Sequence, residues 1–337
     1  MNEPKTRRAR LIRWTGFVVA NLVLIGVLAT VATFYGWARF ARGLPPLQGW
    51  HRQAPTAEFR ATDVRPGYTF DDYLKQEAEV FQQLDTLVAG PWKAEAVGEF
   101  DRFRVGSVAN PEKILDRNWN RSFVLQAAQP IGGVLLVHGL SDSPYSVRAL
   151  AERLHAEGYT VVGLRVPGHG TCPRALAEVT CADWTAAVQI AVRGVRALIP
   201  AGKPLVLAGY SNGGALSVHY ATAAVEDKSL TAVHAVVLFS PMIGISPMAR
   251  VSPLYHAVAQ LSGDEKALWS GVSAEVDPFK YTSWPMNASV QAWTLTQEVE
   301  QRLAALDRSG RMGEMPPILA LQSAIDATVV VPKLITV

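Results

Sequence analysis

Short apolar runs alternate with amphipathic helical patterns from Ser122 to near the end of this 337-residue chain. Each run has about the length of a buried strand, and turn or helix signals separate one run from the next. Strands that are apolar on both faces and joined by helices are typical of a parallel sheet covered by helices on both sides. The pattern therefore predicts an α/β domain over residues 111–337, which is long enough to bury a core.

The same alternation predicts the individual elements. We expect strands over residues 123–125, 133–137, 160–164, 204–208, 233–239 and 317–321, and helices over residues 144–157, 183–198 and 212–224. Residues 241–314 interrupt the alternation and are rich in aromatic residues and methionine, which is typical of a lid over an apolar pocket. The same side chains could equally pack into a small core of the lid itself.

The most specific motif is Gly209-Tyr210-Ser211-Asn212-Gly213, which lies between an apolar strand and a helix of small residues. A nucleophilic serine in this setting occupies a strained strand-to-helix turn, where bulk at the flanking positions would clash. Gly209 and Gly213 remove that bulk. We therefore predict Ser211 as a nucleophile at the carboxyl edge of the sheet, near the positive end of the helix. The alternative is a glycine-rich turn with an idle serine.

A second motif, His138-Gly139-Leu140, ends the apolar strand over residues 133–137. Acyl transfer builds negative charge on the former carbonyl oxygen, and two backbone N–H groups must already face that oxygen. We expect one N–H group from Leu140 and the other from Asn212, directly after the nucleophile. We interpret His138 as a structural residue rather than as the catalytic base.

A third motif, Pro167-Gly168-His169-Gly170, follows the next strand. In order and spacing, the three motifs resemble the monoacylglycerol lipase and lysophospholipase branch of the α/β-hydrolase superfamily, over roughly residues 123–337. The resemblance implies an α/β-hydrolase fold with a mostly parallel sheet and a lid insertion. It implies a serine hydrolase that cleaves a small apolar acyl or lipid-like ester through an acyl-enzyme, without metal or organic cofactor. In that family His169 shapes its loop.

The catalytic acid is expected shortly after a late strand. Asp326 follows the apolar run over residues 317–321, and relatives carry their triad aspartate at this place. A carboxylate there would accept the second N–H group of the base and stabilise the imidazolium. The alternative is an ordinary loop carboxylate.

The catalytic base has no candidate at the expected place. The chain order in this fold is Ser, acid, His, but all seven histidines precede Asp326 and the chain ends eleven residues after it. The simplest interpretation is a chain shortened at its carboxy terminus, without the last strand and the histidine loop. The alternatives are a natural chain that has lost its base, or a base borrowed from the lid, such as His256. Without a base the isolated chain should be impaired, because an unassisted serine hydroxyl is a weak nucleophile.

The amino-terminal segment has the composition of a membrane anchor. Residues 1–13 contain five Lys and Arg residues, and residues 14–38 carry no formal charge. As a helix, residues 14–38 would be about 37 Å long, enough to cross a hydrocarbon core of about 30 Å. The basic flank favours a cytoplasmic amino terminus, with the hydrolase domain on the exported, periplasmic or extracellular side. A cleaved signal peptide is the alternative.

Residues 39–110 are interpreted as a linker followed by an accessory helix that begins after Thr69. Farther along, Cys172 and Cys181 lie nine positions apart in one loop-like segment. In an oxidising compartment they could form a local disulfide. Two unpaired buried thiols are the alternative.

Composition excludes one class of partner. The formal net charge is only +3, and basic residues interleaved with aromatic residues are missing from the body of the chain, so we expect no nucleic-acid partner. No Cys/His cluster or Gly-rich phosphate loop indicates a metal or cofactor. Besides the esterase, a peptidase or thioesterase with the same site, and a membrane-tethered binding domain without catalysis, remain as alternatives.

Overall fold

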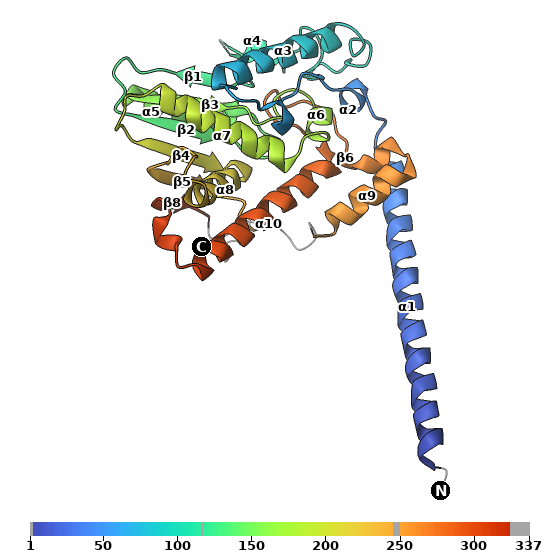
Figure 1. Ribbon diagram of the computed structural model, residues 1–337. Helices are drawn as coiled ribbons and strands as arrows, with labels where there is room; N and C mark the ends of the chain where they lie inside the picture. The colour runs from blue at the N-terminus through green and yellow to red at the C-terminus, as the bar shows by residue number, and fades with distance from the viewer. Residues whose placement is uncertain (1–2, 116, 245–249, 324–337) are drawn as a thin grey trace.

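Six apolar segments form one sheet in the computed structural model, which describes residues 3–115, 117–244 and 250–323 (Figure 1). The strands are β1 Phe123–Leu125, β2 Gly132–Val137, β3 Tyr159–Leu164, β4 Leu205–Tyr210, β5 Ala235–Phe239 and β8 Ile318–Leu321. Their order is β1-β3-β2-β4-β5-β8; β1 runs antiparallel to β3 and every other pairing is parallel. The predicted mostly parallel sheet is confirmed.

Both faces of the sheet are buried at the central strands β2 and β3, as the apolar strands predicted, whereas all four residues of the edge strand β8 are exposed. Along β2, Leu135 and Val137 belong to a large core cluster with residues of five helices, whereas Val134 and Leu136 belong to a second cluster on the other face. This division follows from the two-residue period of a strand, which turns successive side chains to opposite faces. The chain therefore has the α/β-hydrolase fold.

Helices connect and cover the strands. They are η2 Pro144–Val147, α5 Arg148–Ala156, α6 Pro173–Leu176, α7 Cys181–Ala197, α8 Asn212–Glu226, α9 Ser252–Ser262, η4 Glu265–Leu268, α10 Met286–Arg308 and η5 Met312–Glu314. The helix expected over residues 144–157 is divided into η2 and α5, and the other two expected helices agree with α7 and α8 within two residues at each end.

The segment over residues 241–314 is not one lid. Its second half is α10, whose buried residues Leu295, Val299 and Leu303 belong to the large core cluster beside α8 (Figure 1). The first half contains α9, η4 and a small hairpin of β6 Trp269–Gly271 and β7 Trp284–Pro285. A helix that joins two parallel strands must cover a face of their sheet, so only the part before α10 can act as a lid.

The lid aromatic residues largely pack against the domain itself. Trp269, Phe279 and Tyr281 are buried. Phe279 stacks on Tyr145 with ring centroids 3.6 Å apart, and Trp269 meets the ring of His51 edge-on. These three side chains therefore pack against other parts of the domain and not into a separate core of the lid, which was one of the two alternatives.

The segment before β1 packs on the domain as an accessory layer. It contains α2 Gly49–Arg52, η1 Ala61–Asp63, α3 Phe70–Ala89 and α4 Pro111–Ile114. α3 begins as predicted, because the side chain of Thr69 accepts a hydrogen bond from the backbone N–H of Asp72, whose carboxylate accepts from the N–H of Thr69.

A buried ion cluster holds the accessory layer to the sheet. Arg165, at the end of β3, lies 2.8 Å from a carboxylate oxygen of Glu58 and 3.2 Å from one of Glu77, and all three side chains are almost fully buried. The backbone oxygen of Arg165 accepts a hydrogen bond from the hydroxyl of Tyr73. Removing one partner of such a cluster leaves a buried charge uncompensated.

The two cysteines do not form the disulfide considered above. Both are free and buried, and they pack in different core clusters. Cys172 lies beside Trp50 and Trp92, whereas Cys181 opens α7 within the large core. Although the two cysteines are close in sequence, the short helix α6 lies between them, and their thiols do not meet in the fold. Burial raises the pKa of the Cys172 thiol to about 12, which keeps it protonated and unreactive.

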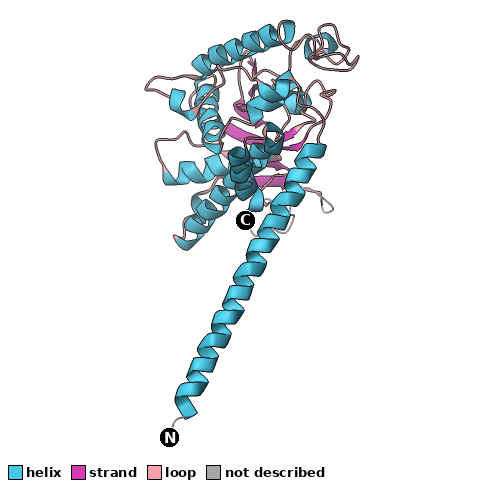
Figure 2. Ribbon diagram, turned by 90° about the vertical axis from the view of Figure 1, so that its right-hand side faces the viewer, coloured by secondary structure: helices cyan, strands magenta, loops and turns pink. Residues whose placement is uncertain are grey.

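The amino-terminal helix extends beyond the predicted span. α1 covers Glu3–Gly43 without interruption, and its stretch Arg13–Gly43 is long and apolar enough to cross a membrane. Figures 1 and 2 show most of α1 projecting from the domain, with only its carboxyl end against it.

Candidate active site

Ser211 occupies a strained turn between β4 and α8. Its backbone dihedrals are φ 52° and ψ −114°, a conformation that residues with a side chain rarely adopt. Hydrogen bonds hold the turn on both sides: the N–H of Ser211 donates to Phe239 O at 3.0 Å, and its C=O accepts from Gly214 N and Met242 N. The side chain remains partly exposed. The strain predicted from the glycine spacing is therefore present at this serine.

The glycines beside Ser211 are required by close backbone approaches. A Cβ atom at Gly209 would lie 2.1 Å from the backbone oxygen of Gly213, and one at Gly213 would lie 2.1 Å from the backbone oxygen of Val137. Gly139 is less confined, because a Cβ atom there would lie 2.8 Å from a side-chain oxygen, Asp142 Oδ2. The three glycines allow the two motif turns to pack against each other.

Gly213→Ala is therefore expected to lower the free energy of unfolding by about 3 kcal/mol or more, since the Cβ atom meets rigid backbone rather than a flexible side chain. Gly313→Ala is the matched control, because nothing lies within 4 Å of a Cβ atom there. Urea unfolding followed by circular dichroism measures both variants. Equal midpoints would show that the turn can relax, against this interpretation.

The expected oxyanion donors are both available. Leu140 follows the end of β2 and Asn212 is the first residue of α8. For neither backbone N–H does an acceptor lie among the residues that the structure describes. The side-chain amide of Asn212 is also buried without a partner in that part of the chain. Unsatisfied N–H groups at a helix amino terminus are suited to bind developing negative charge.

His138 lies beneath this loop and is not placed as a base. Its Nε2 accepts from Val166 N at 3.1 Å, so Nδ1 carries the proton and donates to Gly139 O at 2.8 Å. Burial, and next the neighbouring His169, lower the pKa of His138 well below its usual value, so the ring is neutral. Both nitrogens are occupied, and the ring fixes the Gly139 carbonyl against the β3 end.

His169 shapes its own loop, as the resemblance implied. Its Nδ1 lies 3.0 Å from Pro167 O and 3.2 Å from Val166 O, and its ring meets that of His138 edge-on at 5.0 Å. Burial lowers the pKa of His169 to about 4. Gly168 and Gly170 have φ of 82° and 72°, which explains the glycines on both sides of the histidine.

No base for Ser211 is identified in the described part of the chain. None of the seven histidines has a hydrogen bond to Ser211 there. Besides His138, five of them have hydrogen bonds to other groups: His51, His155, His169, His219 and His234. Asp326, the predicted acid, lies outside the described residues. Of the two predicted catalytic residues, Ser211 and Asp326, only Ser211 therefore lies in the part of the chain that the structure describes.

One residue that sequence reasoning did not single out holds the site together. The backbone N–H of Tyr281 donates to Ser141 O at 2.9 Å, beside the expected oxyanion loop. Its buried hydroxyl accepts from Thr171 N at 2.8 Å and donates to Gly168 O at 3.0 Å. Tyr281 thus ties the lid to two motif loops. Only its aromatic character was visible in the sequence.

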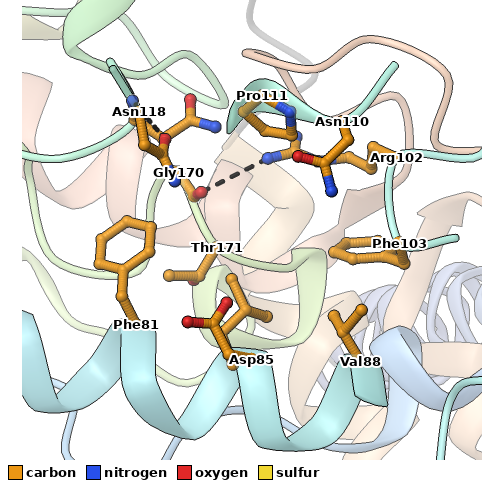
Figure 3. Close-up of a pocket in the computed structure, with 12 residues that line it drawn as sticks. Phe81, Asp85, Val88, Arg102, Phe103, Asn110, Pro111, Asn118, Gly170 and Thr171 are labelled. Carbon is orange, nitrogen blue, oxygen red and sulfur yellow. Dashed lines mark hydrogen bonds between the residues drawn. The ribbon is translucent and has the colours of Figure 1, made fainter. Parts of the chain in front are cut away.

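A small polar cavity lies behind the His169 loop and away from the residues above (Figure 3). It has a volume of about 60 Å³ and is lined by residues of α3, of the segment before β1, and by Gly170 and Thr171. The guanidinium of Arg102 donates to Gly170 O at 3.4 Å across it. This volume holds about two water molecules. Neither Ser211 nor Leu140 lines it, so it supports the loop rather than forming the substrate site.

Residues 128–308, more than half of the chain, match the model of the family described as serine aminopeptidase, S33. A stretch of 104 residues is 38% identical to the thermostable monoacylglycerol lipase of Bacillus sp. (strain H-257), and it covers 29% of this chain and 40% of the lipase. The match thus spans less than half the length of that curated relative.

Two of the similar solved structures carry lipolytic names. One, from a study of the metagenome-derived lipolytic enzymes LipS and LipT, shares 23% identity at a TM-score of 0.46 and covers 60% of this chain and 88% of its own. The monoacylglycerol lipase of Paleococcus ferrophilus shares 18% identity at a TM-score of 0.43, with the same coverage. The arrangement around Ser211 and the match over residues 128–308 agree on the same class of protein.

Proposed function

Because this chain belongs to the α/β-hydrolase family described as serine aminopeptidase, S33, we propose that it is a serine hydrolase that cleaves an apolar acyl or lipid-like ester. Ser211 attacks the ester carbonyl, and the N–H groups of Leu140 and Asn212 hold the oxyanion. The alcohol leaves, and water then releases the acid from the acyl-enzyme. The single observation that supports this proposal best is the strained φ of Ser211, in the turn next to two N–H groups that have no acceptor among the residues described.

The ester is preferred over other acyl substrates because of the relatives. The curated relative and both solved structures carry lipolytic names. The family description favours one alternative, a peptidase, through its words serine aminopeptidase. A panel of acyl esters, acyl thioesters and aminoacyl amides separates these possibilities. We expect turnover of the esters only, at the low rate of a serine without a base.

The assignment of Ser211 as the nucleophile is the part of the proposal that can be tested most directly. A long incubation with a fluorophosphonate probe, followed by peptide mass mapping, is expected to find the label on Ser211. Ser211→Ala should remove the label and Ser229→Ala, at an exposed serine after α8, should keep it. Labelling that persists in Ser211→Ala would refute the assignment.

A second candidate function is a membrane-tethered binding domain that kept the site without catalysis. The observation that favours it is the lack of a histidine bonded to Ser211 among the residues described. Complete resistance of Ser211 to the probe would support this candidate. Turnover of an ester that is lost in Ser211→Ala would exclude it, since a domain without catalysis turns over no substrate.

We also propose that α1 anchors the domain in a membrane with its amino terminus in the cytoplasm, so that the hydrolase domain lies on the exported side. The supporting features are the uncharged residues 14–38 and the five basic residues that precede them. A lipid-like substrate would then be available in the same membrane.

A further inference from the structure

The lid helix α9 is docked on the carboxyl end of α1. Tyr255 of α9 packs against Phe34 and Trp37 of α1, with ring centroids 5.8 and 6.2 Å apart. Ala41 and Ala259 are buried in one cluster between the two helices and η4. In Figure 1 α9 lies beside this end of α1. The lid is therefore attached to the proposed anchor by packed side chains.

A polar contact just beyond α1 fixes the same arrangement. The ammonium group of Lys266, in η4 directly after α9, donates to the backbone oxygen of Leu44 at 2.7 Å. This oxygen belongs to the first residue after α1, where helical hydrogen bonding ends. The contact therefore holds the α9–η4 unit at one height along the anchor.

The docking site lies at the level of a membrane–water boundary. Trp14 and Trp37 flank the uncharged span and are about 35 Å apart along a helix of this rise, close to the thickness of a hydrocarbon core. Trp and Tyr are enriched at both interfaces of a membrane. Arg39 and Arg42, beyond Trp37, place the next turns in the head-group region. Tyr255, and with it α9, thus lies at interfacial depth.

The outward face of α9 is apolar. Leu254, Ala257 and Leu261 follow one another at three- and four-residue steps and so share one face of the helix. All three are exposed, Leu254 to 58% and Leu261 to 87%. α9 contains no acidic, Lys or Arg residue. An exposed leucine stripe is costly in water and suited to the acyl region of a bilayer.

We propose that α9 is an interfacial helix, held by α1 in the head-group region of the same bilayer, with Leu254 and Leu261 inserted among the lipid acyl chains. The occupant of this face is thus the phospholipid bilayer, because α9 packs directly on the end of the apolar span that would cross it. The inference rests on the proposed anchor role of α1. It brings the lid to the surface from which a lipid-like ester would enter.

The test measures depth in the membrane. The full chain carrying Leu254→Cys or Leu261→Cys is labelled with bimane and reconstituted into phosphatidylcholine–phosphatidylglycerol vesicles that contain lipids brominated on the acyl chain. We expect the bromines to quench both labels at least about twofold, as for a helix buried 5–10 Å into the interface. Ala78→Cys, at an exposed position of α3, is the matched control and should stay unquenched. The chain without an added cysteine corrects for the two buried native thiols.

Val27→Cys, within the span of α1, separates failure of this inference from failure of the anchor. Quenching of Val27 with unquenched Leu254 and Leu261 labels would overturn the interfacial role of α9 and leave the anchor standing. An unquenched Val27 label would overturn both. Disulfide cross-linking between chains through Leu254→Cys, without quenching of the label, would assign the face to a second copy of the chain and so also contradict the proposal.

Discussion

The 337-residue chain is expected to react with a fluorophosphonate at Ser211 about 10⁴- to 10⁶-fold more slowly than a serine hydrolase with a complete triad, which is the usual cost of a missing catalytic base. The reason is structural. His138 and His169, the histidines of the motif loops, are neutral. His138 uses both ring nitrogens for hydrogen bonds to backbone groups, and His169 uses Nδ1, whereas no partner of His169 Nε2 lies among the residues that the structure describes. The measurement is the second-order rate constant of labelling at neutral pH.

Two controls make the rate interpretable. Added imidazole can act as a free base, so it should raise the labelling rate of the chain and leave Ser211→Ala unlabelled. His256→Ala tests the remaining histidine alternative, and we expect it to leave the rate unchanged. A rapid reaction in the unmodified chain that is lost in His256→Ala would show that the lid supplies the base, contrary to our expectation.

Arg165→Met is expected to lower the free energy of unfolding by about 3–5 kcal/mol, because it leaves the carboxylates of Glu58 and Glu77 buried without their cation. Glu77→Gln is the matched control. It removes one charge from a cluster with two carboxylates and one guanidinium, and so leaves a neutral Arg165–Glu58 pair. We expect it to cost about 1 kcal/mol. Urea unfolding curves of the three proteins give the comparison.

The pH dependence of Arg165→Met gives an independent check. Burial raises the pKa of Glu77 even though Arg165 opposes the shift. Without Arg165 the pKa rises further, so at pH 5 the native state binds a proton that the unfolded chain, with an ordinary glutamate pKa of about 4.3, mostly does not. Stability of the variant should therefore rise as the pH falls from 7 to 5, by more than in the unmodified chain. A flat profile would show that the carboxylates reach solvent.

The secondary structure was predictable where local patterns decide it. The apolar strands were found because a strand buried on both faces allows few polar residues, and the start of α3 because Thr69 and Asp72 cap each other locally. The Gly209–Gly213 motif specified its turn, since the close approaches at both glycines exclude a side chain. Boundaries shifted by a residue or two at most of these elements.

Errors arose where distant segments meet. α10 was taken for part of the lid, because its apolar residues look the same whether they face the sheet or a pocket. The disulfide between Cys172 and Cys181 was considered from spacing alone, but the two thiols pack into different clusters. Neither the apolar pattern of α10 nor the spacing of the two cysteines indicates which residues will contact them in the folded chain.

The sequence by itself determined the α/β-hydrolase fold, the turn at Ser211 and the apolar span of α1, because each depends on residues close together in the chain. Only the tertiary structure decided that Tyr281 ties the lid to the motif loops, that Arg165 is neutralised by Glu58 and Glu77, and that α9 docks on α1. These contacts join segments separated by many residues, and their energies come from burial and pairing, which exist only once the chain has folded.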